Sequence, residues 1–292
     1  MTDITLLDGG MGQELVHRAG DRPTPLWSTQ VMIDHPGMVA AVHADYRDAG
    51  ATVHTTNTYA ILRDRLVGTG MEDRFAALYA AALHEAKDAG VLAGAIGPIA
   101  ASYRPDLFPA HAEAVEIYAE IAAILAPIVD LIICETVASV AHARAVLEAA
   151  AATGKPVWLA LTVDDSDGTK LRSGEPLADV FAIAGGASAI LANCSSPEAI
   201  DAAINVLATC GKPFGGYANG FTKISDGFLG NKPTVDALSA RKDLGPDEYA
   251  RFAMGWIAKG ATIVGGCCEV GPAHIAKLAQ QISSANHTIV AL

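Results

Sequence analysis

Short apolar runs alternate with longer alanine-rich stretches along most of the chain. The short runs, rich in valine, isoleucine and leucine, predict strands at residues 4–7, 51–54, 92–96, 131–134, 157–161, 189–192, 213–217 and 261–264. The longer stretches carry apolar residues at helical spacing and predict helices at residues 38–49, 74–89, 111–125, 139–152, 177–184, 197–207, 248–258 and 272–282. Eight strand–helix units in strict alternation predict a single α/β domain over residues 1–292, folded as a closed (β/α)8 or TIM barrel.

An open, doubly wound parallel sheet is the main alternative to the barrel. Such a sheet usually carries a complete glycine-rich phosphate loop after its first strand. The corresponding turn here reads Gly10-Met11-Gly12, which lacks the later glycine of that motif. The barrel is therefore the favoured fold.

Two connections are long for loops that follow strands, at residues 8–36 and 219–245. Long connections in a compact domain are commonly functional lids or subunit contacts. In a barrel both would cover the end at which the strands finish, where enzymes of this fold place their chemistry. We therefore expect the functional residues at the carboxyl ends of the strands.

Composition narrows the functional classes. The chain has 292 residues, 51% hydrophobic and 18% charged, with a net charge of −12 and no run of lysine or arginine. Such an acidic surface argues against nucleic acid or an anionic membrane as partner. No apolar stretch reaches the roughly 20 residues that span a bilayer, and the start does not resemble a secretory signal. Together with the odd number of cysteines, five, this predicts a cytoplasmic protein whose thiols serve chemistry or metal rather than a disulfide framework.

Cysteines stand at the ends of two predicted strands. Cys267 and Cys268 follow the eighth strand after a pair of glycines, and Cys194 follows the sixth. Adjacent cysteines do not readily bond each other, because their Cα atoms are only about 3.8 Å apart, but they can share one metal ion. Strands six and eight are second neighbours in a barrel, so Cys194 should lie near the pair. Three thiolates on one face of the mouth predict a zinc site with one open position.

With these residues in place, the chain resembles the zinc-dependent homocysteine S-methyltransferases, the family of the S-methylmethionine- and betaine-dependent enzymes. The matching motifs follow the family's order from about residue 5 to 282. They are residues 7–15 (LDGGMGQEL), 26–28 (LWS), 56–59 (TNTY), 96–98 (IGP), 135–136 (ET), 193–194 (NC), 217–219 (YAN) and 265–268 (GGCC).

The resemblance implies a homocysteine S-methyltransferase-like barrel with Zn²⁺ held by Cys194, Cys267 and Cys268. Homocysteine would bind the open position through its sulfur and take a methyl group from an onium donor, giving methionine. S-methylmethionine and a betaine are the leading donors, and S-adenosylmethionine is a further option. No catalytic residue beyond the zinc site is implied. A free thiol is mostly protonated at neutral pH, and zinc coordination removes that proton.

The resemblance also implies a set of substrate-binding residues. Asp8 and Glu135 would hold the ammonium group of homocysteine, and Asn219 would offer a hydrogen bond. Trp27 and Tyr59 would form an aromatic wall for a cationic donor. Each has a plain structural alternative, such as a turn aspartate, an ion pair at the rim, a loop asparagine, or packing beneath the first long connection.

Two other functions stay open from sequence alone. A zinc hydrolase would carry water at the open position, although three thiolates make a weak Lewis acid and the chain has no His-Glu-x-x-His motif. A non-catalytic zinc- or thiol-binding barrel is also compatible with the fold. In the favoured interpretation the partners are small molecules, homocysteine and a methyl donor. A homo-oligomer stays open.

Overall fold

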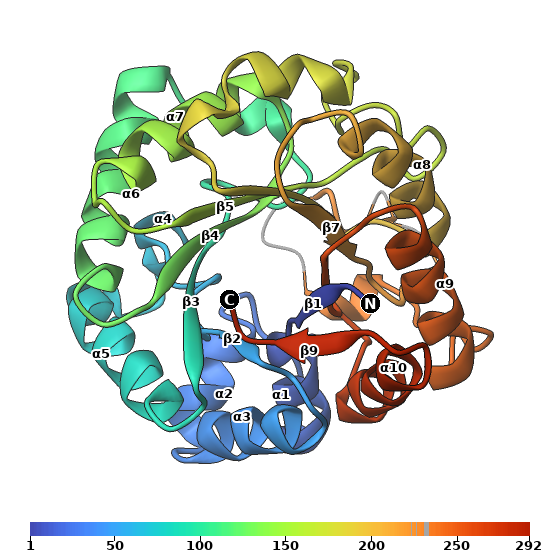
Figure 1. Ribbon diagram of the computed structural model, residues 1–292. Coiled ribbons are helices and arrows are strands. Elements are labelled where there is room, and N and C mark those ends of the chain that lie inside the picture. Colours follow the sequence, from blue (N-terminus) through green and yellow to red (C-terminus); the bar gives the residue numbers. More distant parts are fainter. Residues whose placement is uncertain (223, 226, 231–233) are drawn as a thin grey trace.

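A computed structural model describes residues 1–222, 224–225, 227–230 and 234–292. These residues form a parallel barrel-like sheet inside a ring of helices (Figure 1). Within this part of the chain the strands are β1 (Asp3–Leu6), β2 (Val53–Thr55), β3 (Val91–Ile96), β4 (Leu131–Val137), β5 (Val157–Leu161), β6 (Ala189–Asn193), β7 (Phe214–Tyr217), β8 (Ile263–Val264) and β9 (Thr288–Val290).

The strand order is β2-β3-β4-β5-β6-β7-β8-β1-β9, with parallel pairing throughout the described sheet. A parallel bridge between Leu7 and Val53 joins the end of β1 to β2, and the Asp8 amide donates to the Val53 carbonyl at 3.0 Å. The predicted TIM-barrel fold is therefore confirmed. The second strand begins two residues later than predicted.

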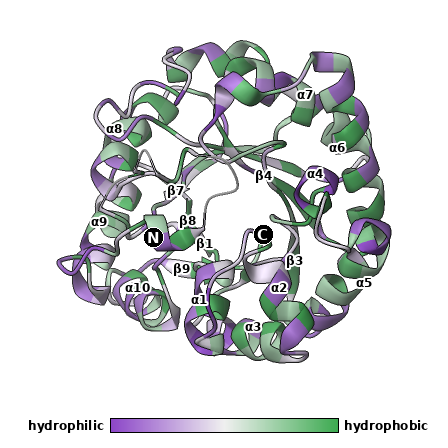
Figure 2. Ribbon diagram, turned by 180° about the vertical axis from the view of Figure 1, so that it is seen from behind, coloured by the Kyte–Doolittle hydropathy of each residue, from purple (hydrophilic) through white to green (hydrophobic). Residues whose placement is uncertain are grey.

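The helices surround the sheet and turn their polar faces outward (Figure 2). Ser196 shows how the local sequence starts one of them, because its side chain accepts from the Ala199 amide while Pro197 takes the first helical position. The α-helices in the described residues are α1 (Met11–Ala19), α2 (Ser28–Asp34), α3 (Met38–Asp48), α4 (Arg63–Leu66), α5 (Phe75–Ala86), α6 (His111–Leu125), α7 (Val140–Ala151), α8 (Pro197–Leu207), α9 (Pro246–Ala258) and α10 (Pro272–Ser284). None of the described helices is long and apolar enough to cross a membrane.

Alternate strand residues fill two separate cores. In β4, Leu131 and Ile133 belong to the cluster inside the barrel, whereas Ile132 and Cys134 pack against the helices. Both faces of β4 are thus buried, and β5 and β6 are also buried along their whole length, which explains why these strands read as nearly continuous apolar runs. The interior is filled by side chains, so substrates are confined to the open end.

The structure corrects the sequence prediction in three places. Residues 8–36 are not a long loop, because they contain α1 and α2. Residues 177–184, predicted as a helix, form a short 3-10 helix at Leu177–Ala182 that runs into another at Ala184–Gly186. The third correction is the unpredicted β9, which pairs with the start of β1 beneath the barrel.

Several described residues of the connection at residues 219–245, among them Phe221, Phe228 and Leu238, line the pocket described below. The ends of this connection are held together by an antiparallel bridge between Phe221 and Ala240, and it contains a short 3-10 helix at Val235–Ala237. Residues 223, 226 and 231–233, which belong to the predicted lid or subunit contact, lie outside the described residues.

Candidate active site

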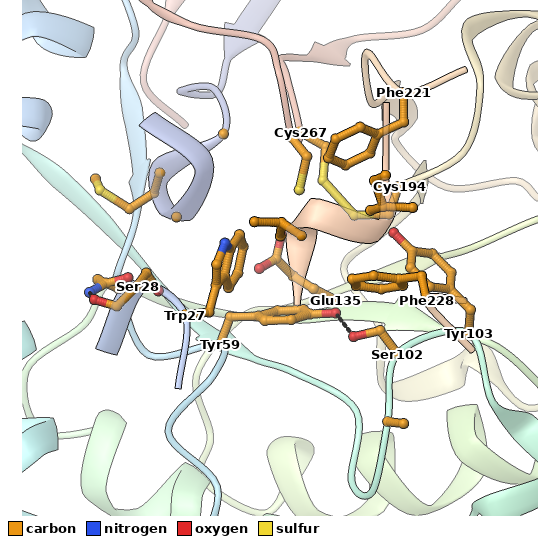
Figure 3. A pocket seen from close by; sticks show the side chains of 18 of the residues that line it. Trp27, Ser28, Tyr59, Ser102, Tyr103, Glu135, Cys194, Phe221, Phe228 and Cys267 are labelled. Carbon is orange, nitrogen blue, oxygen red and sulfur yellow. Dashed lines mark hydrogen bonds between the residues drawn. A yellow bond between two sulfur atoms is a disulfide. The ribbon is translucent and has the colours of Figure 1, made fainter. Parts of the chain in front are cut away.

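A pocket of about 570 Å³ opens at the carboxyl ends of the strands. Seven of the eight residues predicted from sequence line it, namely Asp8, Trp27, Tyr59, Glu135, Cys194, Cys267 and Cys268. Figure 3 shows the aromatic rings of Trp27 and Tyr59 on one side of Glu135 and the sulfur atoms on another. Residues that follow different strands, far apart in sequence, thus form one pocket with polar, sulfur and aromatic groups.

The end of β7 brings the cysteines together. The Cys194 amide donates to the Tyr217 carbonyl at 3.3 Å, and the Cys267 amide donates to the Ala218 carbonyl at 2.9 Å. The Tyr249 hydroxyl donates to the Gly265 carbonyl at 2.6 Å and so fixes the turn before the cysteine pair. Because the chain after β6 and the chain after β8 both bond to the strand between them, their thiols face the same space.

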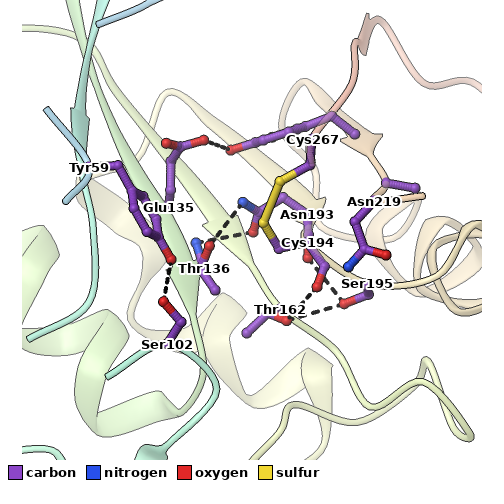
Figure 4. Close-up of a disulfide and its surroundings, with 12 residues drawn as sticks. Tyr59, Ser102, Glu135, Thr136, Thr162, Asn193, Cys194, Ser195, Asn219 and Cys267 are labelled. Carbon is purple, nitrogen blue, oxygen red and sulfur yellow. Dashed lines mark hydrogen bonds between the residues drawn. A yellow bond between two sulfur atoms is a disulfide. The ribbon is translucent and has the colours of Figure 1, made fainter. Parts of the chain in front are cut away.

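Cys194 and Cys267 are joined by a disulfide, with their Cα atoms 5.8 Å apart (Figure 4). The prediction that these cysteines hold zinc concerns the reduced thiols and stays a prediction. The shared anchoring on β7 holds the two residues within the Cα separation that a disulfide needs. Among the described cysteines, Cys268 is a free thiol, partly exposed in the same pocket.

The donor set fits a metal once the disulfide is reduced. Three sulfur atoms on one pocket face are the soft ligands that zinc accepts. Burial, followed by the charges of Glu269 and Glu135, raises the pKa of Cys268 to about 12. This thiol therefore keeps its proton at neutral pH unless a cation displaces it.

Glu135 is one of the carboxyl groups that line the pocket. It lies on β4, and its Oε1 accepts a hydrogen bond of 2.8 Å from the Tyr217 hydroxyl (the upper dashed line in Figure 4). Burial raises the pKa of Glu135 to about 7, while the Tyr217 hydrogen bond opposes that rise. A carboxyl group with a pKa of about 7 is partly protonated at neutral pH, and it becomes a carboxylate when a cation binds beside it.

Asp8 is held by Thr55 of β2. Its Oδ2 accepts from the Thr55 amide at 2.8 Å, and its Oδ1 accepts from the Thr55 hydroxyl at 3.0 Å. Burial raises the pKa of Asp8 well above its usual value despite these hydrogen bonds. The aspartate thus forms part of the pocket wall.

Trp27 and Tyr59 meet edge to face, with ring centroids 6.1 Å apart. Gly12 leaves room for the Trp27 indole, because a Cβ atom at position 12 would overlap the Trp27 ring. This contact gives a physical reason for the glycine of the Gly-Met-Gly turn. The Tyr59 hydroxyl shares a hydrogen bond of 2.7 Å with Ser102.

Asn219 is the predicted site residue that does not line the pocket. It is buried, its Oδ1 accepts from the Phe221 amide at 3.2 Å, and its own amide donates to the Ser195 carbonyl at 3.1 Å. In Figure 4 it lies to the right of the disulfide. These contacts assign Asn219 to the turn that supports the cysteines.

Sequence reasoning missed several pocket residues. Tyr217 ends β7 and could have been found by the same end-of-strand rule. Tyr103 and Phe228, with ring centroids 6.1 Å apart, come from loops without a regular pattern and add to the aromatic wall. Arg65, whose guanidinium lies 5.7 Å from the Tyr59 ring centroid, gave no signal because α4 is only one turn long.

A parallel barrel with sulfur, carboxylate and aromatic groups around its mouth defines a TIM-barrel enzyme with a thiol-lined site. The homocysteine S-methyltransferase family model matches residues 5–282. The homocysteine S-methyltransferase of Escherichia coli K12 is 30% identical, with 94% of each chain covered. Crystal structures of the homocysteine methyltransferase MmuM from Escherichia coli superpose with TM-scores of 0.80 for the metallated form and 0.78 for the oxidized form, each at 26% identity over 96% of both chains.

The chain therefore belongs to the homocysteine S-methyltransferase family. The predicted family and the predicted enzyme class, a methyltransferase acting on homocysteine, are confirmed.

Proposed function

We propose that the protein uses zinc to transfer a methyl group from an onium donor to the thiolate of homocysteine, giving methionine. The observation that carries this proposal is that the three cysteines meet the carboxyl groups of Asp8 and Glu135 in one pocket. S-methylmethionine and a betaine are the leading donors, and S-adenosylmethionine is the third.

In the reduced protein, Cys194, Cys267 and Cys268 would hold the zinc. Bound zinc supplies the chemistry that keeps a substrate thiol deprotonated and nucleophilic at neutral pH. The existence of a metallated form of the Escherichia coli relative supports metal binding by this chain. The chain's own part is to present three sulfur ligands from the ends of β6 and β8 and to leave room beside them.

Glu135 and Asp8 would hold the ammonium group of homocysteine. Both are buried carboxyl groups with raised pKa values, so a cation that enters the pocket stabilises the carboxylate form of each. Tyr217 fixes the Glu135 carboxylate through its 2.8 Å hydrogen bond, and Thr55 fixes that of Asp8. An amino acid anchored in this way would direct its side-chain sulfur toward the cysteines.

Trp27 and Tyr59 would hold the positively charged donor. Their rings face the pocket, and aromatic faces attract sulfonium or quaternary ammonium cations. In the transfer the substrate sulfur forms a bond to the methyl carbon, the carbon–onium bond breaks, and the donor leaves with one positive charge fewer. The attraction between donor and rings is lost with that charge, which favours release.

A donor screen tests the proposal. Reduced, zinc-loaded protein is incubated with homocysteine and each of the three donors, and methionine is followed by mass spectrometry. Methionine formed from at least one donor, and not by the Cys268→Ser variant, supports the proposal. Absence of methionine with every donor contradicts the proposal. Metal-dependent ester or amide hydrolysis by the same protein would then indicate a zinc hydrolase. If no reaction is observed at all, a binding protein is indicated.

A further inference from the structure

A second group of metal-ligand side chains lies behind the pocket wall. It consists of Asp8, His43 of α3 and His54 of β2, each 1% exposed. A carboxylate oxygen and one nitrogen from each imidazole lie within 4.8 Å of one another. The two rings meet at an interplanar angle of 74°, with centroids 6.1 Å apart. The group contains no cysteine and is separate from the sulfur set.

The alternation of β2 explains how the two histidines meet. Val53 points into the barrel interior and Thr55 lines the pocket, so His54 between them points outward to the helices. The buried side of α3 includes Val42, His43 and Tyr46. Packing of α3 on β2 therefore brings one imidazole from each element into the same dry space.

Three of the four imidazole nitrogens in this space have no hydrogen-bond partner in the described part of the chain. Both ring nitrogens of His43 and Nδ1 of His54 are buried and unpartnered among the described residues. Leaving a buried polar atom without a partner costs roughly 1–3 kcal/mol, so such atoms usually mark a missing water or ion. Burial lowers the pKa of His43 to about 3 and that of His54 to about 4, which keeps both rings neutral and able to donate electron pairs.

The geometry fits a transition metal after a small adjustment. Since no two ligand atoms are more than 4.8 Å apart, an ion between them lies within about 2.8 Å of all three. Zinc–nitrogen and zinc–carboxylate bonds are about 2.0–2.2 Å long, so each side chain has to close by about 0.7 Å. Two imidazoles and one carboxylate suit zinc, cobalt or nickel, whereas calcium and magnesium prefer oxygen ligands.

We propose that Asp8, His43 and His54 form a second divalent transition-metal site, independent of the cysteines. The ion would connect the end of β1, β2 and α3 and would take one nitrogen from each imidazole. Asp8 lines the pocket, so the ion can reach the site from the pocket side. The site does not depend on methyl transfer, and the proposed function can fail without affecting it.

The test removes the sulfur ligands and loads the protein with Co²⁺ alone. The Cys194→Ser/Cys267→Ser/Cys268→Ser variant should bind one Co²⁺ per chain and show visible d–d bands without thiolate-to-cobalt charge transfer. Adding His43→Leu or His54→Leu should weaken Co²⁺ binding by about 10-fold or more. His111→Leu is the matched control, because His111 is exposed and pairs with Glu148 on the surface. It should bind Co²⁺ like the parent.

Two results would overturn the second site. One is a cysteine-free parent that binds no Co²⁺, which would assign the gap between the histidines to a water molecule. The other is Co²⁺ binding that persists in both histidine variants. If the serine variants do not fold, the reduced natural chain is compared with its His43→Leu variant: the loss of one bound Co²⁺ per chain supports the proposal, and an unchanged number of bound Co²⁺ contradicts it.

Discussion

Replacement of Tyr217 by phenylalanine should move the pH dependence of homocysteine use upward. The Tyr217 hydroxyl donates to Glu135 Oε1 at 2.8 Å and lowers a carboxyl pKa that burial has raised to about 7. A hydrogen bond to a charged group contributes roughly 1.5–3 kcal/mol, and one pKa unit corresponds to about 1.4 kcal/mol. Loss of the hydroxyl should therefore raise the pKa of Glu135 by about one to two units.

The sign follows from the role proposed for Glu135. Only the carboxylate pairs with the substrate ammonium group, so kcat/KM for homocysteine should rise as pH increases through the pKa of Glu135. In the natural enzyme the half-maximum of this acidic limb should lie near the pKa of about 7. In Tyr217→Phe it should lie about one to two pH units higher, because kcat/KM reports the ionisation of the free enzyme.

The assay is methionine formation at subsaturating homocysteine across the pH range, with reduced, zinc-loaded protein. Glu135→Gln should have low kcat/KM at every pH, and adding Tyr217→Phe to it should cause no further shift of the limb. Tyr79→Phe is the matched control, since it also removes a buried tyrosine hydroxyl but one that donates to the Ile61 carbonyl. A Tyr217→Phe limb at unchanged or lower pH, or a shift of the same size when Tyr217→Phe is added to Glu135→Gln, would refute the assignment of Glu135.

Three further outcomes are expected. Cys268→Ser should lose zinc and activity together while circular dichroism shows the barrel intact; zinc retained at full occupancy would contradict its ligand role. Protein that keeps the Cys194–Cys267 disulfide should neither take up zinc nor form methionine until a thiol reductant is added. Metal analysis and a methionine assay before and after reduction measure this. Activity of the oxidised protein would count against the thiolate site. Gly12→Ala should displace the Trp27 indole, raise KM for the donor more than KM for homocysteine, and cost about 1–3 kcal/mol of stability in thermal unfolding; equal effects on both KM values would argue against Trp27 as a donor contact.

The fold could be predicted where the strand pattern alone decides it. Parallel strands buried on both faces read as apolar runs, and their alternation with helices leaves few topologies. The pattern failed at β9, because a short strand with half-buried residues after the last helix looks like a tail. It also failed at α1, whose apolar positions face a neighbouring helix and the pocket and do not repeat over enough turns.

The site could be predicted only as far as chain direction decides it. Residues that follow parallel strands meet at one end of a barrel, which is why Asp8, Glu135 and the cysteines were found together. Which side chains then touch depends on packing. Neither the Tyr217–Glu135 hydrogen bond nor the approach of His43 to His54 is visible in the spacing of the residues, because each arises from contacts between distant elements.

The central claim is that the acceptor binds zinc through its chalcogen atom at the cysteine site. Selenohomocysteine places a selenium label on that atom, so X-ray absorption at the selenium edge of reduced, zinc-loaded protein observes the contact directly. The proposal predicts a zinc neighbour bonded to selenium, and predicts that Cys268→Ser loses it. A selenium spectrum that shows carbon neighbours alone, with the analogue bound at full occupancy, would contradict it.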